Sequence, residues 1–134
     1  MDRKRLVRYL EDFFSERPEG LIAAYLFGSW GRGTAGSGSD VDLGLLFEEA
    51  PPAELDSEPF RLESELEVAL AIPVQAVVLN TAPPDLLHRV LRDGAIILDR
   101  DRAARIRFEV QARKEYFDLR PILEQYRQPE SASR

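Results

Sequence analysis

A glycine–serine pair near the start of the chain combines the residue types that a phosphate-binding turn needs. Gly28 and Ser29 directly follow an apolar run that ends at Phe27. If a short helix begins at this point, its free backbone N–H groups converge on one spot, where they attract phosphate. Gly28 lets the backbone approach a ligand closely, and the Ser29 hydroxyl adds one hydrogen bond. The pair therefore predicts a site for nucleotide phosphates.

Two carboxylates follow a short distance along the chain. Asp40 and Asp42 stand at the start of a second apolar run, and residues two apart in a strand face the same side. Both side chains should therefore project together, while Val41 and Leu43 enter the core from the other face. Two carboxylates this close repel each other unless a cation lies between them. Mg²⁺ is typically held by such oxygen ligands together with substrate phosphates, so Asp40 and Asp42 are predicted as metal-binding and catalytic residues.

The two motifs gain specificity from their combination. A lone Gly-Ser pair is most often only a turn, and a lone Asp-x-Asp is most often a solvated strand edge. Together, a strand, a Gly-Ser turn and an Asp-x-Asp that opens another strand form a hairpin-like unit with both motifs at one end. Arg32 follows the turn and is placed to reach a triphosphate, and Ser39 precedes the carboxylates, so both join the predicted nucleotide-binding residues. The chain has no G-x-G-x-x-G at a strand-to-helix junction, as a dinucleotide-binding fingerprint requires, and it has no P-loop and no EF-hand loop.

Hydrophobic periodicity places these motifs in an alternating chain of helices and strands. Helices are predicted over residues 2–14, 60–70, 83–92 and 101–118, with a short helical piece to residue 126 after Pro121 interrupts the last one. Strands are predicted over residues 21–27, 41–47, 73–79 and 95–98, and an acidic loop over 48–59. This order favours an α/β (α+β) layer fold with a small mixed sheet flanked by helices. We expect one domain over residues 1–127 and a disordered tail over residues 128–134.

The composition excludes several classes of protein. The 134 residues contain no cysteine, which removes disulfides, thiolate zinc sites and cysteine nucleophiles. A net charge of −6 argues against DNA or long RNA as the main partner, although a bound divalent cation lets an acidic protein bind a nucleotide. No apolar stretch approaches the roughly 18 residues that cross a bilayer, and no apolar run follows the charged N-terminus as in a signal peptide. We therefore expect no membrane contact and a cytoplasmic location.

The spacing of the two motifs resembles the signature of the polymerase-β-like nucleotidyltransferases, in which Gly-Ser is followed by Asp-x-Asp. The size resembles the minimal nucleotidyltransferase (MNT) branch of that superfamily. Further similarity lies in residues 78–84, 89–94 and 115–119, so that the resemblance extends from Leu21 to about Tyr126. It implies a polymerase-β-like fold in which Gly28 and Ser29 approach nucleotide phosphates and Asp40 and Asp42 hold the metals.

The resemblance also implies an activity and a partner. Members of this branch bind a nucleotide, usually ATP, with Mg²⁺, and many are antitoxins encoded beside a HEPN-domain ribonuclease toxin. In such systems the MNT protein silences the toxin by transferring AMP to one of its tyrosines. The chain is therefore expected to be an MNT-type antitoxin that transfers AMP from ATP to a HEPN toxin.

One position departs from the family pattern. A third carboxylate is expected just before the Val78-Leu79-Asn80 segment, and Gln75 stands in its place. An amide can offer a neutral oxygen ligand, but it cannot act as a base and it removes one negative charge. This departure leaves open a catalytically impaired antitoxin that neutralises its HEPN partner by binding. A separate alternative is a nucleotidyltransferase acting on a small molecule. The second is less favoured, since such enzymes usually carry an additional substrate domain.

Overall fold

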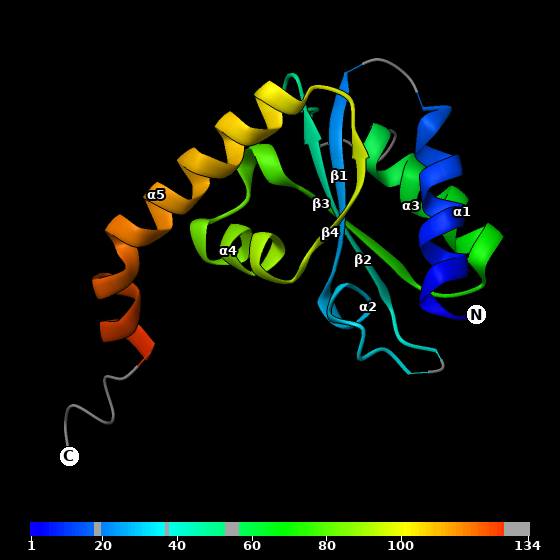
Figure 1. Cartoon of the computed structure of the whole chain (residues 1–134), viewed down its shortest axis with the longest axis horizontal. Coiled ribbons are helices and arrows are strands. Elements are labelled where there is room, and N and C mark those ends of the chain that lie inside the picture. Colours follow the sequence, from blue (N-terminus) through cyan, green and yellow to red (C-terminus); the bar gives the residue numbers. More distant parts are fainter. Residues whose placement is uncertain (18–19, 37, 53–56, 128–134) are drawn as a thin grey trace.

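Four strands form a single mixed sheet. The computed structural model describes residues 1–17, 20–36, 38–52 and 57–127 (Figure 1). The strands are β1 (Leu21–Phe27), β2 (Val41–Phe47), β3 (Val74–Val78) and β4 (Ala95–Asp99). Their order in the sheet is β3-β2-β1-β4, with β1 antiparallel to both β2 and β4 and with β3 parallel to β2. The predicted small mixed sheet is thus confirmed.

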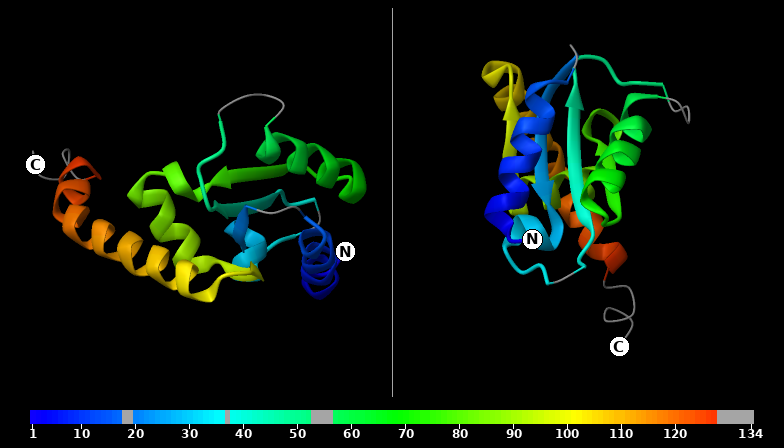
Figure 2. Two further views of the ribbon diagram at one scale, coloured as in Figure 1. Left: turned by 90° about the horizontal axis from the view of Figure 1, so that it is seen from above. Right: turned by 90° about the vertical axis from the view of Figure 1, so that its right-hand side faces the viewer.

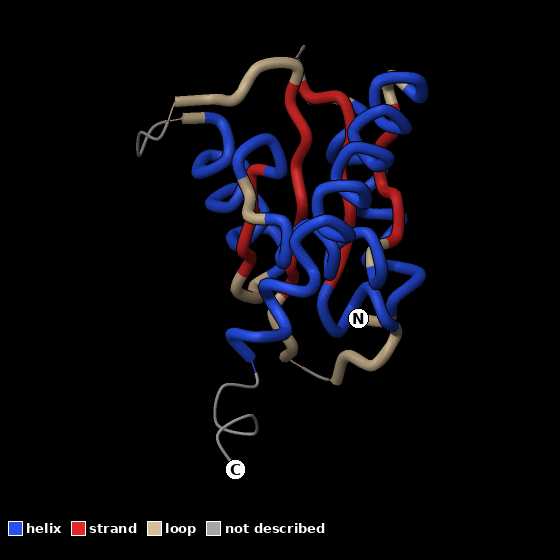
Figure 3. Tube along the Cα trace, turned by 90° about the vertical axis from the view of Figure 1, so that its left-hand side faces the viewer, coloured by secondary structure: helices blue, strands red, loops and turns tan. Residues whose placement is uncertain are grey.

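Helices cover both faces of this sheet (Figures 2 and 3). They are α1 (Arg3–Ser15), α2 (Gly28–Arg32), α3 (Glu58–Leu70), α4 (Pro84–Asp93) and α5 (Arg102–Arg127), with a 3₁₀ turn at Leu79–Thr81. None of the helices in the described part of the chain is long and apolar enough to span a membrane.

Each face of the sheet builds its own core, because neighbouring residues of a strand point to opposite sides. Ala24 and Leu26 of β1 pack with α1 and α3, while Ala23 and Tyr25 pack with α4 and α5. On α1, every fourth residue is buried: Leu6, Leu10 and Phe14. Burial on both faces explains why β1 and β2 are almost entirely apolar instead of alternating.

Side chains close the exposed ends and edges of the sheet. Glu67 and Glu63 of α3 accept hydrogen bonds from the backbone N–H groups of Val74 and Ala76, at 2.9 and 2.6 Å. These are edge-strand groups that would otherwise be free to pair with another chain. Asn80 follows β3 and bonds both the N–H and the C=O of Phe47, at 2.9 and 2.7 Å. Backbone groups of the edge strand β3 and of the last residue of β2 are therefore hydrogen-bonded to side chains of the same protein.

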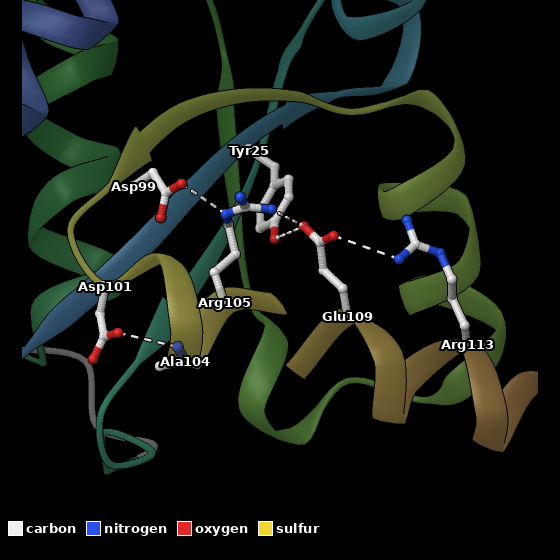
Figure 4. A network of polar contacts seen from close by, with 7 residues as sticks. All are labelled: Tyr25, Asp99, Asp101, Ala104, Arg105, Glu109 and Arg113. Atoms are coloured by element: carbon white, nitrogen blue, oxygen red, sulfur yellow. Dashed lines mark hydrogen bonds and ion pairs between the residues drawn. The ribbon is translucent and has the colours of Figure 1, made fainter. Parts of the chain in front are cut away.

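A polar network ties α5 to the sheet (Figure 4). The Tyr25 hydroxyl donates to Glu109 at 2.7 Å, and Arg105 bridges Asp99 and Glu109 at 2.9 and 2.8 Å. Burial, followed by the bond to Glu109, raises the pKa of Tyr25. Burial opposes ionisation of Glu109, but the hydrogen bonds from Tyr25 and Arg105 outweigh it and lower the pKa of Glu109. The first turns of α5 are thereby fixed against β1 and β4, and further along α5 Tyr116 stacks on His88 of α4 at 3.8 Å.

The structure corrects one predicted element and adjusts others. The interruption predicted at Pro121 is wrong, because α5 continues through it to Arg127. A proline removes one backbone donor, and the carbonyl that loses this donor belongs to Phe117, a residue that is 71% exposed. The strand predicted to end at residue 79 ends at Val78, where a 3₁₀ turn begins. The predicted tail over residues 128–134 lies outside the described residues, as does part of the predicted loop 48–59.

Candidate functional site

The Gly-Ser turn lies at the end of β1, where α2 begins. The short helix predicted after Phe27 is present and starts at Gly28. Gly28 has a φ of +66°, and a Cβ atom at this position would collide with the carboxylate of Asp42. The backbone conformation therefore favours glycine, and any larger residue would also have to displace the Asp42 carboxylate. The turn and the carboxylate are packed directly against each other.

Asp42 reaches this place through the hairpin of β1 and β2. The two strands pair so that Phe27 lies opposite Asp42, which confirms the hairpin-like unit. Val41 and Leu43 are fully buried, whereas Asp42 points to the other face and is only half-buried. Burial, together with the negative charge of Asp40, raises the pKa of Asp42, and the charge of Arg32 opposes this rise. Asp40 and Asp42 thus repel each other, which is the condition that a bound cation relieves.

Gln75 lies beside Asp42 in the sheet. The parallel pairing of β2 and β3 places Asp42 next to Gln75 and Gly44 next to Val77. The position predicted for a third carboxylate is therefore adjacent to Asp42, and it holds an amide. If the family's third carboxylate position is taken two residues further along β3, it falls on Val77, which also carries no carboxylate. Among the described residues, no group of three or more His, Cys, Asp or Glu side chains could hold a metal ion.

A hollow of about 310 Å³ opens over these residues. Its lining comes from β1, α2, β2, β3 and α4: Phe27, Gly28, Arg32, Asp42, Gln75, Val77, Leu86, Arg89 and Asp93. Two arginines and two aspartates therefore face one space with an apolar wall beside them. A nucleotide with its phosphates and a divalent cation carries the matching pattern of charge.

Arg32, whose contact with a triphosphate stays a prediction, faces the hollow from the end of α2. It ends α2, lines the hollow and pairs with Asp93 of α4 at 3.3 Å. Arg89 and Asp93 also line the hollow, although neither was predicted from the sequence as a site residue. Their signal was present within residues 89–94, but the spacing in sequence could not show that α4 crosses beside α2.

The two serines differ in their surroundings. Ser29 is half-buried in the first turn of α2, next to Gly28. The Ser39 hydroxyl accepts a hydrogen bond from the backbone N–H of Gly36 at 2.9 Å, and its carbonyl accepts one from the Trp30 indole at 3.0 Å. Ser39 therefore shapes the loop between α2 and β2 and does not line the hollow. Its part in nucleotide binding stays a prediction, as does that of Ser29.

Comparison with known proteins identifies the family. Residues 9–103 match the family described as polymerase beta, nucleotidyltransferase. The chain therefore belongs to this nucleotidyltransferase family. It is also 30% identical over 113 residues to a candidate protein adenylyltransferase of Methanocaldococcus jannaschii, covering 75% of this chain and 77% of that protein.

Solved structures share the fold. A chain from a toxin–antitoxin complex with AMP-PNP superposes with a TM-score of 0.72 at 23% identity, over 100% of both chains. A chain from a complex of a tri-AMPylated HEPN toxin and its MNT antitoxin from Shewanella oneidensis gives a TM-score of 0.70 at 20% identity, over 96% of this chain and 99% of that one. The predicted polymerase-β-like fold is thereby confirmed.

Proposed function

We propose that this protein is an MNT-type antitoxin that binds ATP with Mg²⁺ and transfers AMP to a HEPN toxin. The observation that carries the proposal is the packing of the Gly28 turn directly against Asp42 in a hollow that Arg32 and Arg89 also line, with the charge of Asp40 acting on Asp42 from outside that lining. Structures of the same fold come from toxin–antitoxin complexes, one with an ATP analogue and one with an AMPylated toxin. The tyrosine of such a toxin is the proposed acceptor. ATP and a ribonuclease partner are both cytoplasmic, so we place the reaction there, and the net charge of −6 gives DNA no part in it.

The donor set fits one divalent cation of the Mg²⁺ type. Asp40 and Asp42 are oxygen ligands that repel each other in the metal-free protein, and Gln75, whose amide has an oxygen to offer, is the neighbour of Asp42 in the sheet. When bound, the cation would neutralise charge on the nucleotide phosphates. Asp40 and Asp42 would hold it.

The remaining residues act on the nucleotide itself. Gly28 and Ser29 would contact the phosphates, and Arg32 and Arg89 would neutralise the triphosphate from the side of α2 and α4. The toxin tyrosine oxygen would bond to the α-phosphorus, and the bond to the leaving pyrophosphate would break. The tyrosine proton would pass to water, because the amide of Gln75 cannot accept it.

A second function is favoured by Gln75 alone. If the missing carboxylate has removed catalysis, the protein would neutralise its toxin by forming a complex. In that case nucleotide binding is dispensable, and an Asp42→Asn variant would still neutralise the toxin. The proposal of AMP transfer predicts that the same variant loses neutralisation.

Transfer of radioactive label decides between the two. ATP labelled at the α-phosphate is incubated with the purified protein, the HEPN partner and Mg²⁺, and label on the partner is counted. Transfer should occur and be abolished by Asp40→Asn, while Asp12→Asn, an exposed aspartate of α1, should leave it unchanged. ATP labelled at the γ-phosphate should transfer nothing. Absence of transfer by the wild-type protein, combined with intact neutralisation, would establish the binding antitoxin instead.

A further inference from the structure

Asp93 is an acidic residue of the hollow to which neither the family signature nor the proposed chemistry gives a part. It is the last residue of α4, and its side chain is only 11% exposed. Arg92 donates to it twice, from Nε at 2.9 Å and from Nη2 at 3.0 Å. Arg32 donates to the same carboxylate at 3.3 Å. The two bonds from Arg92 fix the carboxylate, and the longer bond leaves Arg32 the more weakly held partner.

Backbone packing holds the Arg32–Asp93 pair in place. A Cβ atom on Gly31 would lie 2.6 Å from the carbonyl oxygen of Leu26 and 2.8 Å from that of Asp93. Only glycine therefore lets α2 come this close to the end of α4. The contact brings the main chains at Arg32 and Asp93 close together, which places their side chains within reach of each other.

Arg32 shares the hollow with two carboxylates, one that binds it and one that is proposed to bind a cation. One is Asp93, with which it pairs, and the other is Asp42, where the charge of Arg32 offsets part of the rise in pKa. An arginine side chain that lost Asp93 would find Asp42 as the next carboxylate in the same hollow. A guanidinium bonded to Asp42 would occupy the oxygens that a divalent cation needs.

We propose that Asp93 is a positioning residue that holds the Arg32 guanidinium away from Asp42, so that Asp40 and Asp42 stay open to a divalent cation. This inference rests on the proposed function only in assigning the cation to those two aspartates. It gives the Arg92–Asp93 pair of α4 a purpose in the site, since Arg92 keeps the Asp93 carboxylate turned toward Arg32.

The test is a thermodynamic cycle on metal binding, without nucleotide or partner. Mn²⁺ binding to the full chain is followed by the loss of the free-ion signal in electron paramagnetic resonance. Asp93→Asn should weaken binding about tenfold, as is common when the residue that orients a metal site is lost. Arg32→Gln should not weaken binding, and in that background Asp93→Asn should have little further effect, because no guanidinium is left to occupy Asp42.

Charge alone is the competing explanation, since Asp93→Asn also removes a negative charge near the cation. If it were correct, Asp93→Asn would weaken Mn²⁺ binding equally with and without Arg32, and the inference would be overturned. Asp93→Glu keeps the charge but moves the carboxylate by one methylene. If Asp93 positions Arg32, Asp93→Glu should bind Mn²⁺ more weakly than wild type. If only charge matters, Asp93→Glu should bind Mn²⁺ as tightly as wild type. This variant can also be used if Asp93→Asn does not fold.

The outcome for the wild-type protein separates this inference from the proposed function. If wild type binds no Mn²⁺, the metal assignment fails and the inference fails with it. If wild type binds Mn²⁺ and the effects of Asp93→Asn and Arg32→Gln simply add, only the inference fails. Label transfer to the partner can then still be measured as described above.

Discussion

Asp42 on β2 and Gln75 on β3 are neighbours in the parallel part of the sheet, and both line the same hollow. Parallel neighbours present their side chains on the same face, so the amide lies where a further carboxylate would share a cation with Asp42. Without a metal, the neutral Gln75 side chain favours the stability of the folded protein, because a third negative charge near Asp40 and Asp42 would add to their repulsion. With Gln75 in place of the family's carboxylate, the site also has fewer charged ligands for a cation.

Gln75→Asp should therefore have opposite effects with and without metal. In the metal-free protein we expect a loss of stability of up to about 1 kcal/mol, because like charges lie side by side in the sheet. Added Mg²⁺ or Mn²⁺ should raise the melting temperature of this variant more than that of wild type, and should raise label transfer if the missing carboxylate limits catalysis. Thermal unfolding with and without metal measures the first effect. Gln75→Asn is the neutral control, and an equal response of both variants to metal would contradict the prediction.

Substitutions at three glycines within residues 28–36 can distinguish two constraints: a positive φ and a lack of space for a side chain. Gly33 has a φ of +79° but open space around it, whereas Gly28 has a φ of +66° and Asp42 against it; Gly36 has open space and no such φ. Gly33→Ala should cost about 1–2 kcal/mol from backbone strain alone. Gly28→Ala should cost about 1–3 kcal/mol more, because its methyl group also displaces Asp42.

Urea unfolding measures these costs, with Gly36→Ala as the control that should change stability by less than about 0.5 kcal/mol. Gly28→Ala should also weaken binding of Mn²⁺, which Gly33→Ala should leave intact. Equal stabilities for the Gly28 and Gly33 variants would show that the contact with Asp42 adds nothing.

The hairpin of β1 and β2 could be predicted from the sequence because its signals are local. Two apolar runs of strand length border a glycine-rich turn, and the alternation of Asp40, Val41 and Asp42 fixes which side faces the core. The position of Gln75 came from the resemblance to the nucleotidyltransferases, and the register of β2 with β3 agrees with it. Those inferences together produced the carboxylate half of the site.

The α4 half of the site could not be predicted in this way. Periodicity identifies Leu87 and Val90 as the buried side of α4, but Arg89 and Asp93 lie elsewhere on the helix and face the hollow only because α4 packs against α2. That packing depends on long-range contacts of Gly31 that leave no pattern in the sequence. The continuation of α5 through Pro121 could not be predicted either, because a proline inside a helix can break it or only kink it.

Asp42 should make stability depend on pH in an unusual direction. Its pKa is raised in the folded protein, so the folded state holds this proton more tightly than the unfolded state, and the resulting stabilisation is lost as pH rises. At pH 7 the metal-free protein is therefore destabilised by this charge. Asp42→Asn should raise the melting temperature at pH 7, and the advantage should disappear below about pH 4, where the unfolded-state carboxyl is protonated.

Metal provides the control for that prediction. Mg²⁺ should stabilise wild type at pH 7 by relieving the repulsion between Asp40 and Asp42, and it should have much less effect on Asp42→Asn. A variant that melts lower than wild type at pH 7 without metal would contradict the proposed repulsion.

The anchor of α5 should be measurable as a coupled pair. Tyr25 donates to the Glu109 carboxylate from a nearly fully buried position, so Tyr25→Phe removes a charge-assisted hydrogen bond worth about 1.5–3 kcal/mol. The pKa of Glu109 is lowered in the folded state, so its contribution is present above about pH 4.3, the unfolded value, and is lost as pH falls through the lower folded pKa. The cost of Tyr25→Phe should therefore shrink in acid.

A double-mutant cycle with Glu109→Gln isolates this bond, and urea unfolding at pH 7 supplies the four stabilities. The control is Arg120→Gln, which breaks the exposed Arg120–Glu124 pair further along the same helix and should cost no more than about 0.5 kcal/mol. Hydrogen exchange should show faster opening of the first turns of α5 in Tyr25→Phe, because that hydroxyl joins the helix to β1. Additive effects of Tyr25→Phe and Glu109→Gln would mean that the helix is held by its apolar contacts with α4 and the sheet, and that the network orients α5 without stabilising it.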